Sequence, residues 1–185
     1  INNLFNKRKK GINMAFKTPI TIKKAIDEVA SNSFILPAIQ REFVWNTGQI
    51  EDLFDSLIKG YPIGSFLFWK VDPDRIGDFQ FYRFMDKYHE RDYTHNEQFS
   101  PLQNQPITAV LDGQQRLTAL NIGLRGWYAY KLPRYWWSND DAFPKRELYI
   151  NLIEPDEEQF GDGYNFKFLR EKDVQAKNEE NYWFK

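Results

Sequence analysis

The spacing of hydrophobic and polar residues near the start of the chain predicts a short helix followed by a short strand. Between residues 21 and 30 the apolar side chains recur at helical spacing, and Thr21 can act as the N-cap of the helix. Residues 34–36 are all apolar and precede Pro37, which is typical of a short strand that ends there.

A second helix has the clearest pattern in the sequence. Its apolar residues form one stripe, which consists of Ile50, Leu53, Phe54, Leu57 and Ile58. Thr47 can cap the start of this helix, and Gly60 can end it. The nearly unbroken apolar run at residues 65–71 then predicts a strand that is buried on both faces.

The second half of the chain contains a strand–turn–helix unit. Residues 107–111 predict a strand, Asp112 and Gly113 form a tight turn, and residues 114–124 predict a helix with a leucine face. Further strands are expected at residues 79–85, 147–152 and 164–169. The polar residues 86–104 lack a pattern and predict a long excursion that is mobile or folds over a ligand. These elements favour an α+β fold in which helices flank a small mixed sheet.

Length and composition fit one globular domain. The chain has 185 residues, of which 42% are hydrophobic and 17% aromatic, so a sizeable core is expected. We interpret residues 14–185 as that domain, whose C-terminal part could be truncated, and residues 1–13 as an extension or linker. The basic run at residues 7–10 could instead be an arm for nucleic acid or a partner.

Several function classes are excluded by residue content. The sequence has no cysteine, which excludes disulfides and thiolate sites and fits a cytoplasmic location. Only His89 and His95 offer imidazoles, so we assign no metal site. No apolar run reaches the roughly 20 residues of a membrane span, and no membrane partner is expected. The net charge of −1 disfavours a domain that mainly grips DNA but leaves room for a small anion.

The turn between residues 112 and 116 is the leading candidate for an anion site. The first N–H groups of a helix lack intrahelical partners, and phosphate binds well there. Gly113 allows a close backbone approach, and Arg116 can add a two-pronged contact. Gln114 and Gln115 could position a water molecule or grip a sugar or base. Two plainer interpretations stay open, namely Asp112 as a helix cap and Arg116 as a solvated surface residue.

Gln40 and Arg41 form a second candidate. They follow a proline break and precede an aromatic segment at residues 43–45 that is expected to anchor the loop in the core. The alternative is an ordinary ion pair between Arg41 and a nearby acidic residue. The sequence contains no glycine–lysine phosphate loop and no dinucleotide fingerprint, and the acidic residues at 154–158 are interpreted as a solvated loop.

Two ordered motifs, about seventy residues apart, resemble those of a known family. The first is Leu-Pro-Ala-Ile-Gln-Arg-Glu-Phe-Val-Trp at 36–45, and the second is Val-Leu-Asp-Gly-Gln-Gln-Arg-Leu-Thr-Ala-Leu at 110–120. Both resemble the N-terminal family of GmrSD-type restriction endonucleases, also called domain of unknown function 262. The match continues through residues 50–53 and 60–64.

This resemblance implies a fold and a site. The implied core is similar to ParB and sulfiredoxin, with the phosphates of a nucleotide against the helix start. Gln40, Arg41, Gly113 and Arg116 would then bind phosphate. Asp112, Gln114 and Gln115 would take the catalytic roles, although whether Asp112 supports Mg²⁺, orients water or fixes the turn stays open.

The resemblance also implies a function, with alternatives. The expected domain binds a nucleoside triphosphate, with Mg²⁺ as a further cofactor, and hydrolyses it to regulate anti-phage restriction of modified DNA. Longer relatives carry a nuclease domain with a histidine–asparagine–histidine motif, which this chain lacks, so DNA would be reached through the full-length protein or a partner nuclease. One alternative is a DNA-recognition module in which Lys17, Lys23 and Lys24 contact the DNA backbone. The other is an interaction scaffold that uses the aromatic residues at 127–137. Self-association as a homo-oligomer also stays open.

Overall fold

The computed structural model describes residues 18–39, 42–102, 105–153, 164–177 and 182–185. Residues 1–13, Lys17, Gln40, Arg41 and the acidic run at 154–158 lie outside the described residues, so their predictions are not tested. The helices are α1 (Ile22–Ala30), α2 (Thr47–Ile58), α3 (Gln114–Arg125) and α4 (Glu171–Lys177), with short 3₁₀ helices at Pro73–Asp78 and Asp140–Ala142. The strands are β1 (Phe34–Pro37), β2 (Leu67–Lys70), β3 (Phe81–Tyr82), β4 (Lys87–His89), β5 (Gln98–Phe99), β6 (Thr108–Asp112), β7 (Trp127–Ala129), β8 (Glu147–Asn151), β9 (Asn165–Leu169) and β10 (Trp183–Phe184).

A five-stranded mixed sheet contains the strand that leads into the candidate site. Its strand order is β2-β6-β1-β3-β5, in which β1 and β6 pair in parallel while the other neighbours are antiparallel. Phe34 lies opposite Thr108 in the parallel register. The mixed sheet and its flanking helices confirm the predicted α+β class.

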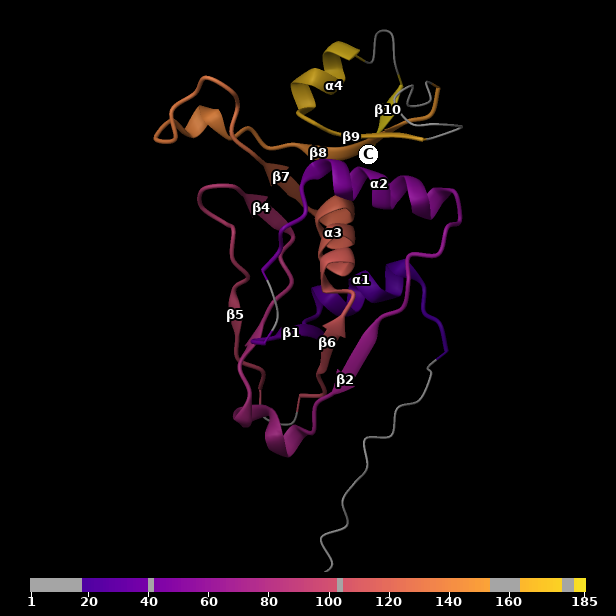
Figure 1. The fold of residues 1–185 in the computed structure, drawn as a ribbon, viewed down its shortest axis with the longest axis vertical. Helices are drawn as coiled ribbons and strands as arrows, with labels where there is room; N and C mark the ends of the chain where they lie inside the picture. Colours follow the sequence, from indigo (N-terminus) through magenta and orange to yellow (C-terminus); the bar gives the residue numbers. More distant parts are fainter. Residues whose placement is uncertain (1–17, 40–41, 103–104, 154–163, 178–181) are drawn as a thin grey trace, which may run out of the picture.

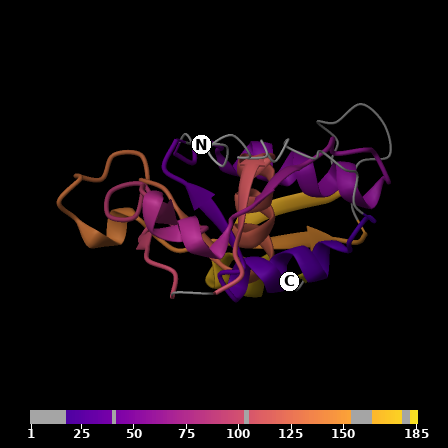
Figure 2. The same ribbon diagram turned by 90° about the horizontal axis from the view of Figure 1, so that it is seen from below.

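Helix α3 joins this sheet to a second layer. It rises directly from the end of β6 towards the antiparallel sheet β10-β8-β9 (Figure 1). Helices α1 and α2 lie on opposite sides of α3, and both contact it (Figure 2). A short parallel pair, β4 and β7, follows at the end of α3.

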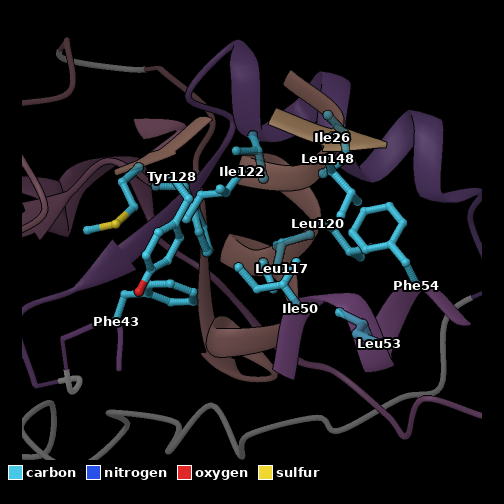
Figure 3. Close-up of a cluster of buried hydrophobic side chains, with 14 of the residues drawn as sticks. Ile26, Phe43, Ile50, Leu53, Phe54, Leu117, Leu120, Ile122, Tyr128 and Leu148 are labelled. Atoms are coloured by element: carbon cyan, nitrogen blue, oxygen red, sulfur yellow. The ribbon is translucent and has the colours of Figure 1, made fainter. Parts of the chain in front are cut away.

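One hydrophobic cluster connects these layers. It contains buried residues from α1, α2, β6, α3 and the β8–β9 sheet, with Leu117, Leu120 and Ile122 of α3 at its centre (Figure 3). At Gly123, a Cβ atom would lie 2.6 Å from the Phe54 ring and 3.1 Å from Leu148. The elements therefore pack too closely for a larger residue at this crossing.

Helix α2 also fixes the second sheet through carboxylates. The buried Asp55 forms an ion pair of 2.7 Å with Lys59 and accepts a hydrogen bond of 2.8 Å from the amide of Tyr164. Glu51 accepts a hydrogen bond of 2.8 Å from the amide of Phe168 in β9. These contacts satisfy backbone donors that would otherwise lack partners beside the helix.

The prediction that the strand at residues 65–71 is buried on both faces is wrong. Only Leu67–Lys70 forms β2, and this strand lies at the edge of the sheet with one neighbour, so its residues are exposed or half-buried. The aromatic residues of this run are covered locally instead, since Phe68 packs on Phe34 and Trp69 packs on Phe79. A run of apolar residues can therefore reflect ring-to-ring packing at an edge as well as a buried strand.

Two further details differ from the sequence prediction. The strand expected at 79–85 is only Phe81–Tyr82, and the excursion at 86–104 contains two short strands, β4, which pairs with β7, and β5, which pairs with β3. Thr21 caps α1 as predicted, but the cap of α2 is Asn46 and not Thr47. Asn46 exchanges hydrogen bonds with Gln49, which completes a capping box that Thr47 is one residue too late to form. In the described part of the chain, no helix is long and apolar enough to cross a membrane.

Candidate functional site

The strand–turn–helix unit predicted around Gly113 is present. Gly113 is the N-cap of α3 with φ +85°, and as a glycine it provides no side-chain cap for this helix start. A Cβ at this position would also lie 2.3 Å from the ring of Phe66. Glycine is therefore required both for the left-handed backbone and for the close approach of Phe66. The amide groups that open α3 carry a partial positive charge.

Asp112 is not the helix cap that its sequence position allows. Its carboxylate lies 3.6 Å from the Arg116 guanidinium, and 68% of its side chain is exposed. The αL turn at Gly113 places the cap position one residue later than Asp112. This leaves an exposed carboxylate beside the start of α3.

Arg116 connects the start of α3 to the preceding turn. Its guanidinium donates hydrogen bonds to the carbonyl oxygens of Ile63 and Ser65 and lies 4.7 Å from the centroid of the Phe66 ring. Only 19% of its side chain is exposed. Arg116 is therefore not a solvated surface arginine, because its fork closes the turn at residues 63–65 against the helix.

Gln115 joins the two sequence motifs. Its side-chain oxygen accepts a hydrogen bond of 3.0 Å from the amide of Val44, and its side-chain nitrogen donates one of 2.8 Å to the carbonyl of Glu42. Gln114, by contrast, is buried and donates to the carbonyl of Val110 at 2.7 Å. The segment that directly follows Gln40 and Arg41 is thus fastened to the first turn of α3.

Other contacts hold this segment along the helix. Phe43 is buried in the main cluster, as predicted, whereas Val44 is exposed. The hydroxyl of Tyr128 donates to the carbonyl of Trp45 at 3.1 Å, and His95 Nδ1 lies 2.6 Å from the Glu42 carboxylate. The loop therefore has a fixed path from the start of α3 to the start of α2.

A tyrosine-lined pocket of about 240 Å³ lies at the start of α2. Its lining residues are Asn46, Thr47, Tyr88, Glu90, Tyr128 and Tyr130. The rings of Tyr88 and Tyr128 stack with centroids 4.4 Å apart, and burial raises the pKa of both phenols, so both stay protonated at neutral pH. The sequence does not indicate this pocket, because its residues come from three separated segments.

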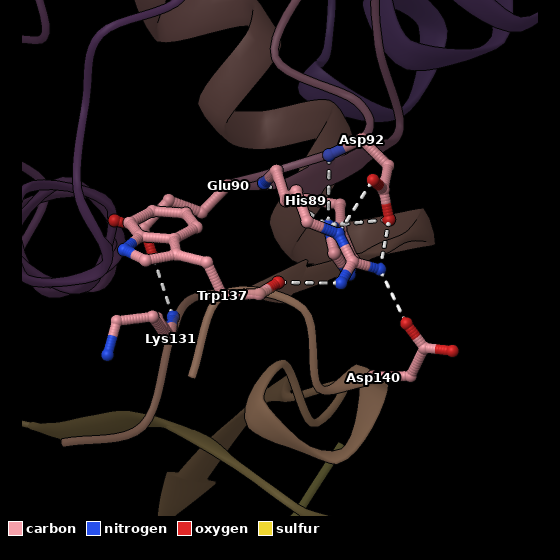
Figure 4. A network of polar contacts seen from close by, with 7 residues as sticks. His89, Glu90, Asp92, Lys131, Trp137 and Asp140 are labelled. Carbon is pink, nitrogen blue, oxygen red and sulfur yellow. Dashed lines mark hydrogen bonds and ion pairs between the residues drawn. The ribbon is translucent and has the colours of Figure 1, made fainter. Parts of the chain in front are cut away.

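A polar network fixes the loop beyond this pocket (Figure 4). Arg91 pairs with Asp92 at 2.9 Å and with Asp140 at 2.7 Å, and it donates to the carbonyl of Trp137 at 2.9 Å. Its guanidinium holds the pKa of Asp92 below its usual range. His89 Nδ1 accepts hydrogen bonds from the amides of Arg91 and Asp92. No group of three or more metal-ligating side chains occurs within the described ranges.

Comparison with known proteins identifies the class of domain. The sequence profile of the GmrSD restriction endonuclease N-terminal domain matches residues 22–185. The chain therefore belongs to the family of GmrSD restriction endonuclease N-terminal domains. It is also 36% identical, over 102 residues, to an uncharacterized protein of Methanocaldococcus jannaschii. This match covers 54% of the chain but only 15% of that relative.

Proposed function

We propose that this domain binds a nucleoside triphosphate at the start of α3 and hydrolyses it to regulate a restriction system that acts on modified DNA. The observation that carries the proposal is the Gln115 clamp, which brings the segment at residues 42–44 to a helix start whose N-cap, Gly113, has no capping side chain. Helix-start amide donors without intrahelical partners, together with nearby cations, are what a phosphate group requires.

We assign the phosphate-binding roles as follows from the contacts of α3 and from the position of residues 40 and 41 in the sequence. The amides after Gly113 would bind phosphate oxygens, and Arg116 would add positive charge while it holds the 63–65 turn. Gln40 and Arg41, which precede the clamped segment in sequence, would supply further phosphate contacts. Their side chains would thus complete the positive side of the site.

Asp112 is the best-placed catalytic residue. Its exposed carboxylate can hold Mg²⁺ together with phosphate oxygens, or it can orient the attacking water. Both ends of the Gln115 amide and the nitrogen of Gln114 are already hydrogen-bonded. We therefore assign these two glutamines positioning roles, in which they fix the loop and the helix start around the ligand.

Further proposals about the fold, the location and the partners accompany this one. We interpret the parallel strands β1 and β6, with α3 after β6, as a ParB- and sulfiredoxin-like core within a single domain at residues 14–185. The shared hydrophobic cluster supports one folding unit. The domain would act in the cytoplasm and reach DNA through the rest of its protein or a partner nuclease, and self-association is compatible with it.

Thermal melting and calorimetry with each nucleotide, with and without Mg²⁺, test the proposal. A ligand at about 100 times its Kd adds about 2.7 kcal/mol of stability. Arg41→Ala should weaken binding by about 10-fold to 100-fold, since a hydrogen bond to a charged group contributes about 1.5–3 kcal/mol. Asp112→Asn should reduce phosphate release. Arg125→Ala, in the last turn of the same helix, is the matched control and should behave as wild type.

Two results would overturn the proposal. One is the absence of stabilisation and heat with every nucleotide and with inorganic triphosphate. The other is a salt-dependent gel shift of modified DNA without any phosphate release, which would instead indicate a DNA-recognition module.

A further inference from the structure

The tyrosine-lined pocket at the start of α2 has the chemistry of a site for a neutral planar ring. None of its six lining side chains is cationic, and Glu90 is its only carboxylate. Aromatic walls offer a stacking surface, and a carboxylate repels phosphate. The pocket therefore disfavours an anion and favours a flat group that can donate hydrogen bonds.

Two features of the pocket disfavour an organic cation as the ligand. The guanidinium of Arg146 already lies 3.6 Å from the centroid of the Tyr130 ring, so a second cation on this ring would meet like charge. The start of α2, at Asn46 and Thr47, also presents the positive end of a helix dipole to the pocket. A neutral heterocycle avoids both repulsions.

Glu90 is held ready to accept hydrogen bonds. Its Oε2 accepts one of 2.6 Å from the amide of Lys131 (Figure 4), and its Oε1 has no recorded partner in the described part of the chain. Each carboxylate oxygen can accept two hydrogen bonds, so Glu90 keeps capacity for a ligand. The Arg91 network fixes the chain directly after Glu90, because Arg91 pairs with both Asp92 and Asp140.

The pocket lies close to the proposed phosphate site. The amide of Val44 is bonded to Gln115 in the first turn of α3, and Asn46, which lines the pocket, is two residues further along. Two residues span at most about 7 Å. A single nucleotide could therefore extend from the start of α3 along this loop to the tyrosines.

We propose that this pocket holds the base of the nucleotide and that Glu90 selects bases with a ring N–H. The inference rests on the proposed function and adds the class of base to it. Guanine offers a ring N–H beside an amino group, which a carboxylate can accept together, and uracil offers one ring N–H. Adenine and cytosine present an acceptor nitrogen at the corresponding place, which Glu90 repels.

Calorimetric titration of the whole chain with GTP, inosine triphosphate, UTP, ATP, CTP and inorganic triphosphate tests this inference. We expect GTP to bind about 10-fold more tightly than ATP and CTP, with UTP and inosine triphosphate between them. Glu90→Gln keeps an acceptor for the Lys131 amide, so it should remove this ranking and leave the affinity for inorganic triphosphate unchanged. Glu97→Gln, an exposed glutamate that pairs with Arg83, is the control and should keep the ranking.

A second measurement needs only the wild-type chain. Transferred nuclear Overhauser effects between base protons of GTP and tyrosine ring protons should appear when GTP binds. Equal affinity for all nucleotides, with no such contact, would overturn the base pocket while triphosphate binding still supports the proposed function. If neither nucleotides nor inorganic triphosphate bind, the proposed function fails as well.

Discussion

The Gln115 clamp allows a quantitative prediction about the loop that follows the first motif. Gln115→Ala removes two hydrogen bonds to backbone groups of residues 42 and 44. At about 1 kcal/mol for each bond, the loop should lose 1–2 kcal/mol of local stability, which corresponds to a roughly 5-fold to 30-fold larger open population. Phe43 and the Tyr128 hydroxyl still hold the loop, so the global melting temperature should change little.

Amide hydrogen exchange, measured residue by residue, is the appropriate assay. The Val44 amide should exchange roughly 5-fold to 30-fold faster in Gln115→Ala, because its acceptor is lost, while core amides of α3 keep their protection. Gln115→Glu should act in the same direction, since its second oxygen would face the Glu42 carbonyl as an acceptor. Gln175→Ala, in the exposed part of α4, is the control. An unchanged Val44 exchange rate in Gln115→Ala would refute the clamp.

Three further predictions concern the turn and the second layer. Gly113→Ala should destabilise the fold by several kcal/mol in denaturant unfolding, because it forces φ +85° on a side chain and meets Phe66 at 2.3 Å; a loss below 1 kcal/mol would contradict this. Arg116→Ala should lower the free energy of unfolding by about 3 kcal/mol, because the hydrogen bonds to two carbonyl oxygens are lost. Arg116→Lys should restore only part of this stability, and full restoration would show that the two-pronged guanidinium is not needed. Arg170 holds the pKa of Asp173 below its usual range, so the stability that this carboxylate contributes is present above about pH 4 and is lost as the pH falls through the lower folded-state pKa. Between pH 6 and pH 2 the melting temperature of Asp173→Asn should therefore fall less steeply than that of the wild type. Equal dependence of the melting temperature on pH in both proteins would exclude this contribution.

Helical periodicity was informative where one face of an element is buried by the rest of the fold. The stripe of α2 and the leucine face of α3 both pack into the main cluster, and the predicted ends lie within two residues of the observed ones. The sequence did not show which of two adjacent residues caps α2, because asparagine and threonine are both favourable N-caps. The reach of Gln49 back to the Asn46 amide decides it.

The site was predicted only where its residues adjoin in sequence. Gly113 and the opening of α3 follow from one local pattern, whereas the partners of Arg116 and Gln115 lie more than fifty residues away. The tyrosine-lined pocket requires strand pairing between β4 and β7, which places Tyr88 opposite Tyr128. The grouping of Tyr128 with the exposed aromatic residues at 127–137 was wrong, because Tyr128 is buried, while Trp136 is 83% exposed.

The close contact at Gly123 makes the folding of the two sheets interdependent. Its neighbours Phe54 and Leu148 belong to α2 and β8, so the helix that begins at the Gly113 turn also packs against the second sheet. A polypeptide cut before residue 147 would lack Leu148, would expose the Phe54 ring to water and would tend to aggregate. Laboratory dissection of this domain should therefore keep both sheets, and a swap of the second sheet between relatives should succeed only if small residues meet at this contact.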